Sequence, residues 1–175
     1  MCTEKGDQVT TKLQDLITRA GAGERSQFSG LGFIYHLNGE QTEGRLSVVE
    51  HPIEPRSVAA PMHTHTKEDE FSFVTEGEVT FQLADEIIVA RPGDFVLKPR
   101  GIPHAFWNAS DKPCSFLELI SPAGFENYFR AIGKLWDPER GPDFEKFYAL
   151  AEEYGLQIDM TDAARIQGLI DQAGS

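Results

Sequence analysis

The sequence predicts an all-β fold, a small jelly-roll barrel, with a short N-terminal helix and a helical C-terminal extension. Three observations predict it. Between Leu31 and Ile120, short runs rich in β-branched and aromatic residues alternate with Gly, Pro, Asn and Asp, as in strands joined by turns. With 175 residues, 40% of them hydrophobic, the chain can bury one core but is too short for two barrels. Helical periodicity is confined to the two ends.

Eight runs between residues 31 and 120 have the length and composition of strands, which suits a barrel or jelly roll. They are LGFIYHL, GRLSVVE, EFSFVTE, EVTFQL, EIIVA, DFVLK, HAFWN and SFLELI. Before them, apolar residues of the segment 8–20 fall on one helical stripe, which predicts a short amphipathic helix. The stripe consists of Val9, Leu13, Leu16, Ile17 and Ala20.

After Ser121 and Pro122 the pattern changes to helical spacing. Aromatic and aliphatic residues recur from Phe125 to Trp136 and again from Phe144 to Tyr154, just before Gly155. We therefore divide the chain into an N-terminal helical segment, residues 1–30, a barrel, residues 31–120, and a helical extension packed on the barrel, residues 121–175.

Composition limits the possible partners. The net charge of −12 opposes binding to nucleic acid, whose phosphates attract clustered Lys and Arg. The first 20 residues carry charges and no apolar run, and no stretch approaches the length of a membrane span, so we expect a cytoplasmic protein without a membrane partner. Cys2 and Cys114 do not suggest a disulfide framework, and we expect Cys114 to be buried as a small apolar residue.

Three histidines and a glutamate have spacings that can bring them to one point. His63 and His65 project from the same face of a strand, because side chains alternate along it. Glu70 is an odd number of residues beyond His65, so a turn at residues 66–69 is needed before it can face the same way. After that turn, Glu70, Ser72 and Val74 face inward.

The fourth member of the set, His104, follows a tight corner. Pro99, Gly101 and Pro103 mark this corner, and His104 then begins a strand on which Phe106 shares its face. Three imidazoles and one carboxylate that meet at one place form a ligand set for a divalent transition metal.

These two stretches resemble the two motifs of the cupin superfamily. The first motif, a histidine pair, a glutamate and a glycine, corresponds to His63, His65, Glu70 and Gly77. The second motif corresponds to Gly93, Pro99, Gly101, His104 and Asn108, which match at every position. One departure is Ser57, which stands where the family has a turn glycine. The resemblance covers residues 31–120 and implies a jelly-roll barrel around a metal held by His63, His65, Glu70 and His104.

The ligand types suit Fe, Ni, Mn, Co, Cu or Zn and do not choose among them. A cupin that keeps the fold with a vacant centre is the alternative. Four protein ligands around an octahedral ion leave two positions open for water, substrate or dioxygen. Glu70 is also a candidate catalytic base, because the imidazoles are occupied as ligands.

Strand parity also predicts the wall of a substrate pocket. Parity assigns Ser72, Val74 and Phe106 to this wall, with Met62 and Phe95 as nearby possibilities. Such a lining favours an aromatic or otherwise apolar small molecule. Among cupins, a single barrel with a helical extension looks most like the bacterial quercetin 2,3-dioxygenase group. That resemblance implies a dioxygenase acting on an aromatic or enol-containing molecule.

Two alternatives to a dioxygenase remain open at this point. One is a non-oxidative metal enzyme, namely an isomerase, cyclase, decarboxylase or hydrolase, and the other is a binding protein without catalysis. We also expect a homodimer, because exposed sheet edges and aromatic helices offer more apolar surface than one core needs.

The remaining polar candidates have less specific interpretations. His36 and His51 lack partners in sequence, and we expect them to be surface or core histidines. Glu68 and Asp69 could support the ligands from behind, but a solvated turn is the preferred interpretation.

Overall fold

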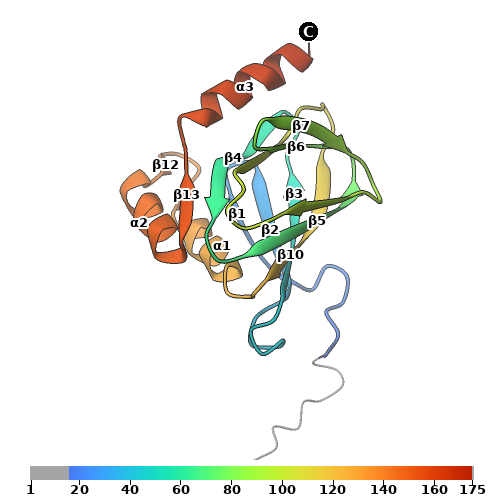
Figure 1. Cartoon of the computed structure of the whole chain (residues 1–175), viewed down its shortest axis with the longest axis vertical. Helices are drawn as coiled ribbons and strands as arrows, with labels where there is room; N and C mark the ends of the chain where they lie inside the picture. The colour runs from blue at the N-terminus through green and yellow to red at the C-terminus, as the bar shows by residue number, and fades with distance from the viewer. Residues whose placement is uncertain (1–15, 175) are drawn as a thin grey trace, which may run out of the picture.

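The computed structural model describes residues 16–174, and all of its strands except the short pair β11 and β12 belong to two antiparallel sheets that enclose the main core (Figure 1). The first sheet has the order β1-β2-β3-β10-β5-β8 and the second the order β13-β4-β9-β6-β7. The fold is mostly β and its sheets are antiparallel, in agreement with the β-rich barrel predicted from the sequence. The strands before the C-terminal segment are β1 Glu24–Phe28, β2 Leu31–Leu37, β3 Ser47–Ile53, β4 Ser57–His65, β5 Asp69–Glu76, β6 Val79–Leu83, β7 Glu86–Ala90, β8 Phe95–Lys98, β9 His104–Asn108 and β10 Cys114–Ser121.

The central strands alternate between the core and the opposite face. In β3 every second side chain from Ser47 to Ile53 is buried, and β10 pairs with it antiparallel along its length. Both sheets contribute to the core: Phe33 and Phe116 come from the first sheet, and Phe81 comes from the second. Their burial removes apolar surface from water, which is the main term that holds the two sheets together.

The turn between β5 and β6 requires a glycine. Gly77 has a φ of 67°, a left-handed conformation that costs other residues free energy. A Cβ at this position would also lie 2.7 Å from the carbonyl oxygen of Pro113. The glycine of the first motif therefore permits both the turn and the close approach of the chain that leads into β10.

The C-terminal segment is helical, as predicted, but it also completes a sheet. It contains α1 Glu126–Gly133, α2 Phe144–Tyr154 and α3 Asp162–Ala173, and the short pair β11 Trp136–Asp137 and β12 Gly141–Pro142 joins α1 to α2. Strand β13, Leu156–Ile158, pairs with β4 so that Leu156 lies opposite His65. α1, α2 and β13 lie on one side of the barrel (Figure 1), and this side carries the cavity described below.

The predicted N-terminal helix over residues 8–20 lies mainly outside the described residues. Residues 16–20, which are described, form no α-helix. β1 follows at Glu24–Phe28 and pairs antiparallel with β2, so the first sheet begins before residue 31. We did not predict this strand, because its sequence ERSQF is mostly polar and its side chains are largely exposed. None of the helices among the described residues is long and apolar enough to cross a membrane.

Candidate metal centre

The four predicted ligands come from three strands in both sheets. β4 carries His63 and His65, which are both buried, with Thr64 on the opposite face. β9 runs antiparallel to β4 and places His104 directly opposite His63. Glu70 comes from β5 in the other sheet. The cluster therefore lies where the two sheets face each other.

The corner before β9 has the conformation that the sequence predicts. Gly101 has a φ of 77°, and its N–H donates a 2.8 Å hydrogen bond to the carbonyl oxygen of His65. The Ile102 N–H donates to the carbonyl oxygen of Pro99 at 3.1 Å. These bonds fix the start of β9 against the end of β4, so His104 is held beside the histidine pair.

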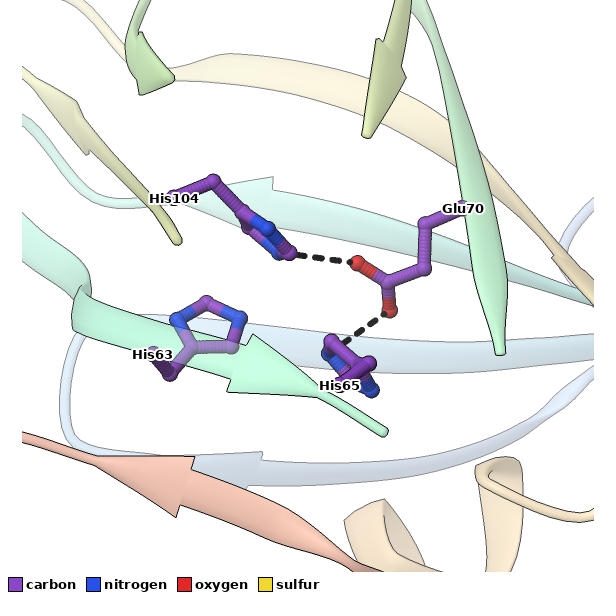
Figure 2. A group of neighbouring side chains, drawn as sticks. All are labelled: His63, His65, Glu70 and His104. Atoms are coloured by element: carbon purple, nitrogen blue, oxygen red, sulfur yellow. Dashed lines mark ion pairs between the residues drawn. The ribbon is translucent and has the colours of Figure 1, made fainter. Parts of the chain in front are cut away.

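The ligand atoms of His63, His65, Glu70 and His104 all lie within 4.8 Å of one another. Figure 2 shows the four side chains pointing toward one shared space. Glu70 bridges two of the histidines: its Oε1 lies 3.4 Å from Nε2 of His65, and its Oε2 lies 3.3 Å from Nε2 of His104. Ligands bonded to one ion at about 2.1 Å have comparable separations.

Backbone carbonyls determine which nitrogen of two histidines is free to bind a cation. Nδ1 of His63 donates to the carbonyl oxygen of Pro61 at 2.8 Å, and Nδ1 of His104 donates to that of Ile102 at 3.1 Å. In the neutral ring the proton is then on Nδ1, and Nε2 keeps a lone pair directed into the cluster.

The cluster lacks hydrogen-bond donors for these lone pairs. Nε2 of His104 is buried without a hydrogen-bond partner among the described residues, although a carboxylate oxygen of Glu70 is near. Two acceptors that face each other are not stable by themselves, because a buried polar atom without a partner costs free energy. A cation between them removes this cost. The residues present therefore fit a divalent transition metal, with His63, His65, Glu70 and His104 as its ligands.

The electrostatics of the cluster keep the ligands in the form that binds a metal. Burial lowers the pKa of both His63 and His104, which leaves the imidazoles neutral near pH 7. Burial alone would raise the pKa of Glu70, but His65 and the Lys98 ammonium hold that pKa well below its ordinary value. Glu70 is therefore an ionised ligand.

Glu68 departs from the prediction of a solvated turn. Its side chain is buried, with a residue exposure of 6%, and its Oε2 lies 3.5 Å from Nδ1 of His65. A carboxylate on the far nitrogen of a metal-binding histidine fixes the ring and increases its basicity. Asp69 does belong to the surface: it pairs with Arg100, whose guanidinium lies 2.7 Å from Oδ2.

A buried ion pair behind the cluster was not predicted. Nζ of Lys98 lies 2.9 Å from Oε2 of Glu70 and also contacts Oε2 of Glu118, while the Ser72 hydroxyl donates to the Glu118 carboxylate at 3.2 Å. Burial raises the pKa of Glu118 to about 8, against the opposing effect of Lys98. The sequence offered one signal for a buried Lys98: it lies two residues after the apolar Val96 on β8, so the two side chains share a face. Both are buried in the structure.

The cluster borders a cavity of about 370 Å³, a volume within the range of small-molecule sites. His63, His65 and Glu70 form part of its wall, and side chains of α1 and α2 form another part of it. Most of the remaining wall is apolar and aromatic; its rings include Phe28, Phe33, Phe106, Phe125, Phe129 and Phe147.

Of the predicted pocket residues, Phe106 lines the cavity. Ser72 and Val74 face inward, but Ser72 binds Glu118 and Val74 packs in the core. Met62 lies on the other face of β4, against Ile166 of α3 and its neighbours. Phe95 is 69% exposed and packs on Phe73, so the prediction that it lies near the pocket was wrong. It has the opposite parity to the inward Val96.

The comparisons with known proteins agree with this arrangement. Residues 50–120 match the family model Cupin_2, described as Cupin domain. These residues form a cupin domain. The segment contains all four residues of the cluster and ends with β10, so the cupin domain includes the whole candidate centre. No curated protein sequence matches the chain.

Three solved structures show the same fold. A sugar phosphate isomerase of the cupin superfamily from Silicibacter pomeroyi is 25% identical, with a TM-score of 0.52 over 59% of this chain and 73% of that one. A predicted oxalate decarboxylase from Thermotoga maritima is 22% identical, with a TM-score of 0.52 over 57% and 91%. A nucleoside dehydratase from Streptomyces is 17% identical, with a TM-score of 0.50 over 60% and 80%. Cupin domains of this shape thus occur in enzymes of different reaction classes.

Proposed function

We propose that this protein is a metal-dependent dioxygenase that acts on a small aromatic or enol-containing molecule. One observation carries the proposal: the cluster of metal ligands opens onto a largely aromatic cavity of about 370 Å³. An apolar wall favours a flat apolar molecule and excludes water from the ligands. The ligand set supports the metal, and the cavity supports the substrate class.

The residues of the chain have separate roles in this proposal. His63, His65, Glu70 and His104 would hold the ion, which would supply Lewis acid or redox chemistry when bound. Phe106 and Phe125 contact the histidines, with ring centroids 6.3 Å from His63 and 4.3 Å from His65, respectively. They hold the imidazoles in place and form the apolar surface for the substrate.

We keep Glu70 as the candidate base, although its contacts favour the role of ligand. Lys98 binds one oxygen of Glu70 and lowers its pKa, so this carboxylate accepts a proton less readily than an ordinary glutamate. Glu70→Gln separates the two roles. Loss of turnover with full metal occupancy supports a base, whereas loss of the metal supports a ligand only; full occupancy together with full turnover contradicts both.

A non-oxidative metal enzyme is the second candidate. The observation in its favour is Glu118, a second carboxylate that lines the cavity and whose pKa is raised by burial to about 8. A group that titrates near neutral pH can exchange a proton with a substrate without dioxygen. The isomerase, decarboxylase and dehydratase of similar fold belong to such reaction classes. A binding protein without catalysis is the third candidate.

The deciding experiment measures turnover with and without dioxygen. Protein loaded separately with Fe, Ni, Mn, Co, Cu and Zn is assayed against a panel of enols and flavonoids, and His104→Ala is the inactive control. Oxygen consumption matched to product supports the dioxygenase. Equal turnover under nitrogen overturns it in favour of the second candidate, and ligand binding without turnover supports the third.

We also propose a homodimer. Exposed apolar side chains lie on β7 and β8, which are edge strands of the two sheets: Ile87, Ile88, Val89, Phe95 and Leu97. Exposed apolar edges tend to pair with another chain. Light scattering at micromolar concentration should give a dimer, and Ile88→Lys should shift it toward the monomer. A monomeric wild type contradicts the proposal.

A further inference from the structure

His51 is a buried histidine that does not belong to the metal cluster. It lies on β3, opposite Phe116 of β10, and only 1% of its surface is exposed. Three phenylalanines surround its ring, Phe33, Phe116 and Phe129, with centroids 5.4, 5.1 and 5.1 Å away. His51 also lines the cavity into which the metal cluster opens. A polar ring thus occupies a position where all its ring neighbours are apolar.

One ring nitrogen of His51 is used by the fold, and the other is not. Nδ1 lies 3.1 Å from the carbonyl oxygen of Gly32, so Nδ1 must carry the proton. Burial lowers the pKa of His51 to about 4, and the ring is therefore neutral near pH 7. Nε2 is then a hydrogen-bond acceptor, and the residues that the structure describes provide no donor for it.

A purely structural role does not account for this acceptor. The bond of Nδ1 to Gly32 gives the fold a use for one nitrogen of the ring, whereas Nε2 is left at the wall of the cavity, where a donor of a bound molecule can reach it. His36 differs from His51 in this respect, because its Nε2 has a side-chain partner, Oε2 of Glu50, at 2.9 Å. His51 has no such partner within the described chain, yet it stands on the wall of a cavity.

We propose that His51 is a substrate-binding residue, and that its Nε2 accepts a hydrogen bond from a hydroxyl of the molecule bound in the cavity. The inference rests on the proposed function in one respect, namely that the substrate lies in this cavity with one end at the metal centre. It adds a second polar contact, remote from the metal, and so narrows the substrate class to aromatic molecules with a hydroxyl group at the far end.

The placement of the rings supports a two-ended molecule. The Phe106 ring is near both histidines, with its centroid 6.3 Å from that of His63 and 6.4 Å from that of His51. An aromatic ring against Phe106 can therefore direct one substituent toward the metal ligands and another toward His51. A neutral acceptor also disfavours a carboxylate at this end, because two acceptors repel each other.

The test uses cobalt(II)-loaded full-length protein and three probes: benzohydroxamic acid, whose hydroxamate can chelate the metal, and its 3-hydroxy and 4-hydroxy derivatives. Calorimetry measures each dissociation constant for the wild type and for His51→Asn. Asparagine can still donate from its Nδ2 to the Gly32 carbonyl, but it places no acceptor where Nε2 stood. His36→Asn, on the exposed side of the first sheet, is the matched control.

We expect at least one hydroxylated probe to bind the wild type about 3- to 10-fold more tightly than benzohydroxamic acid. This is the gain in affinity that one hydrogen bond typically provides. This preference should disappear in His51→Asn and persist in His36→Asn, while benzohydroxamic acid binds all three proteins equally. A preference that survives in His51→Asn overturns the inference, as does a wild type without any preference. Failure of all three probes to bind contradicts the proposed function as well. Unchanged thermal melting of His51→Asn shows that its fold is intact.

Discussion

Two groups of buried polar side chains lie next to each other between the sheets, and they differ in how their hydrogen bonds are satisfied. In the first, His63, His65 and His104 surround Glu70, and the Nε2 of His104 has no donor among the described residues. In the second, Lys98 and Ser72 both donate to Glu118. The second group has a hydrogen-bond donor for its carboxylate within the chain. The first group lacks a donor for the Nε2 of His104, and a bound cation would take that place. Similar burial therefore supports a structural role in one case and a binding role in the other.

Glu70 belongs to both groups. One of its oxygens accepts from Lys98 at 2.9 Å, and both face histidine nitrogens. The satisfied group thus holds the carboxylate of the unsatisfied group in position.

The largest effect should come from Lys98→Met. Removing the ammonium leaves the buried charge of Glu70 uncompensated and takes a hydrogen-bond donor from Glu118, which costs about 3–5 kcal/mol in the free energy of unfolding. Urea denaturation of metal-free protein measures this loss in the free energy of unfolding. The double variant Lys98→Met with Glu70→Gln should recover part of the loss, because the uncompensated charge is removed. A Lys98→Met protein as stable as the wild type would show that the pair does not hold the barrel together.

His51 should make the protein less stable in acid. Its pKa is about 4 in the folded protein and about 6.5 when unfolded, so the unfolded state binds more protons between these values. Stability from this group is present above about pH 6.5 and is lost as the pH falls toward 4, by up to about 3 kcal/mol. Urea denaturation of metal-free wild type and His51→Asn at a series of pH values measures it. Parallel curves for the two proteins would refute the assignment.

His104→Ala should weaken the binding of cobalt(II) by more than about 100-fold, because it removes a direct ligand, and loss of a supporting partner alone costs about 10- to 100-fold. Calorimetric titration of metal-free protein measures the affinity. His36→Ala, which removes a histidine outside the cluster, should bind cobalt(II) as the wild type does. Equal affinities for wild type and His104→Ala would mean that the four residues do not share an ion.

Glu68→Gln should weaken the binding of cobalt(II) by about 10- to 100-fold, because the glutamine no longer offers a charged acceptor to Nδ1 of His65. Asp69→Asn is the matched control: it is the adjacent acid, it pairs with Arg100, and it should leave the affinity unchanged. If the two variants have the same affinity, the contact between Glu68 and His65 does not support the ligand.

The sequence predicted the candidate centre better than its surroundings. Side-chain alternation placed His63 and His65 on one face, and the corner before His104 required the residues Pro99, Gly101 and Pro103; both inferences use neighbouring positions only. The burial of Glu68 depends on how the turn at residues 66–69 packs, which composition does not reveal. A polar turn residue is usually solvated, and the prediction followed that tendency.

The pocket could be predicted only in part. Parity states which side chains of a strand face inward, and it correctly gave the inward direction of Ser72, Val74 and Phe106. It does not state whether an inward side chain meets the core, another polar group or a cavity. Phe95 shows a second limit: it was expected near the wall without an assignment by parity, and it lies on the exposed face of β8.

The sequence by itself determined the barrel, the four candidate ligands and the helical C-terminal extension, because periodicity and motif spacing are local properties of the chain. Only the tertiary structure decided that Lys98 pairs with Glu118, that Leu156 pairs with His65, and that α1 and α2 line an aromatic cavity. The physical reason is that these contacts join residues from different strands and helices. Their free energies depend on burial and on partners that no single segment of sequence contains.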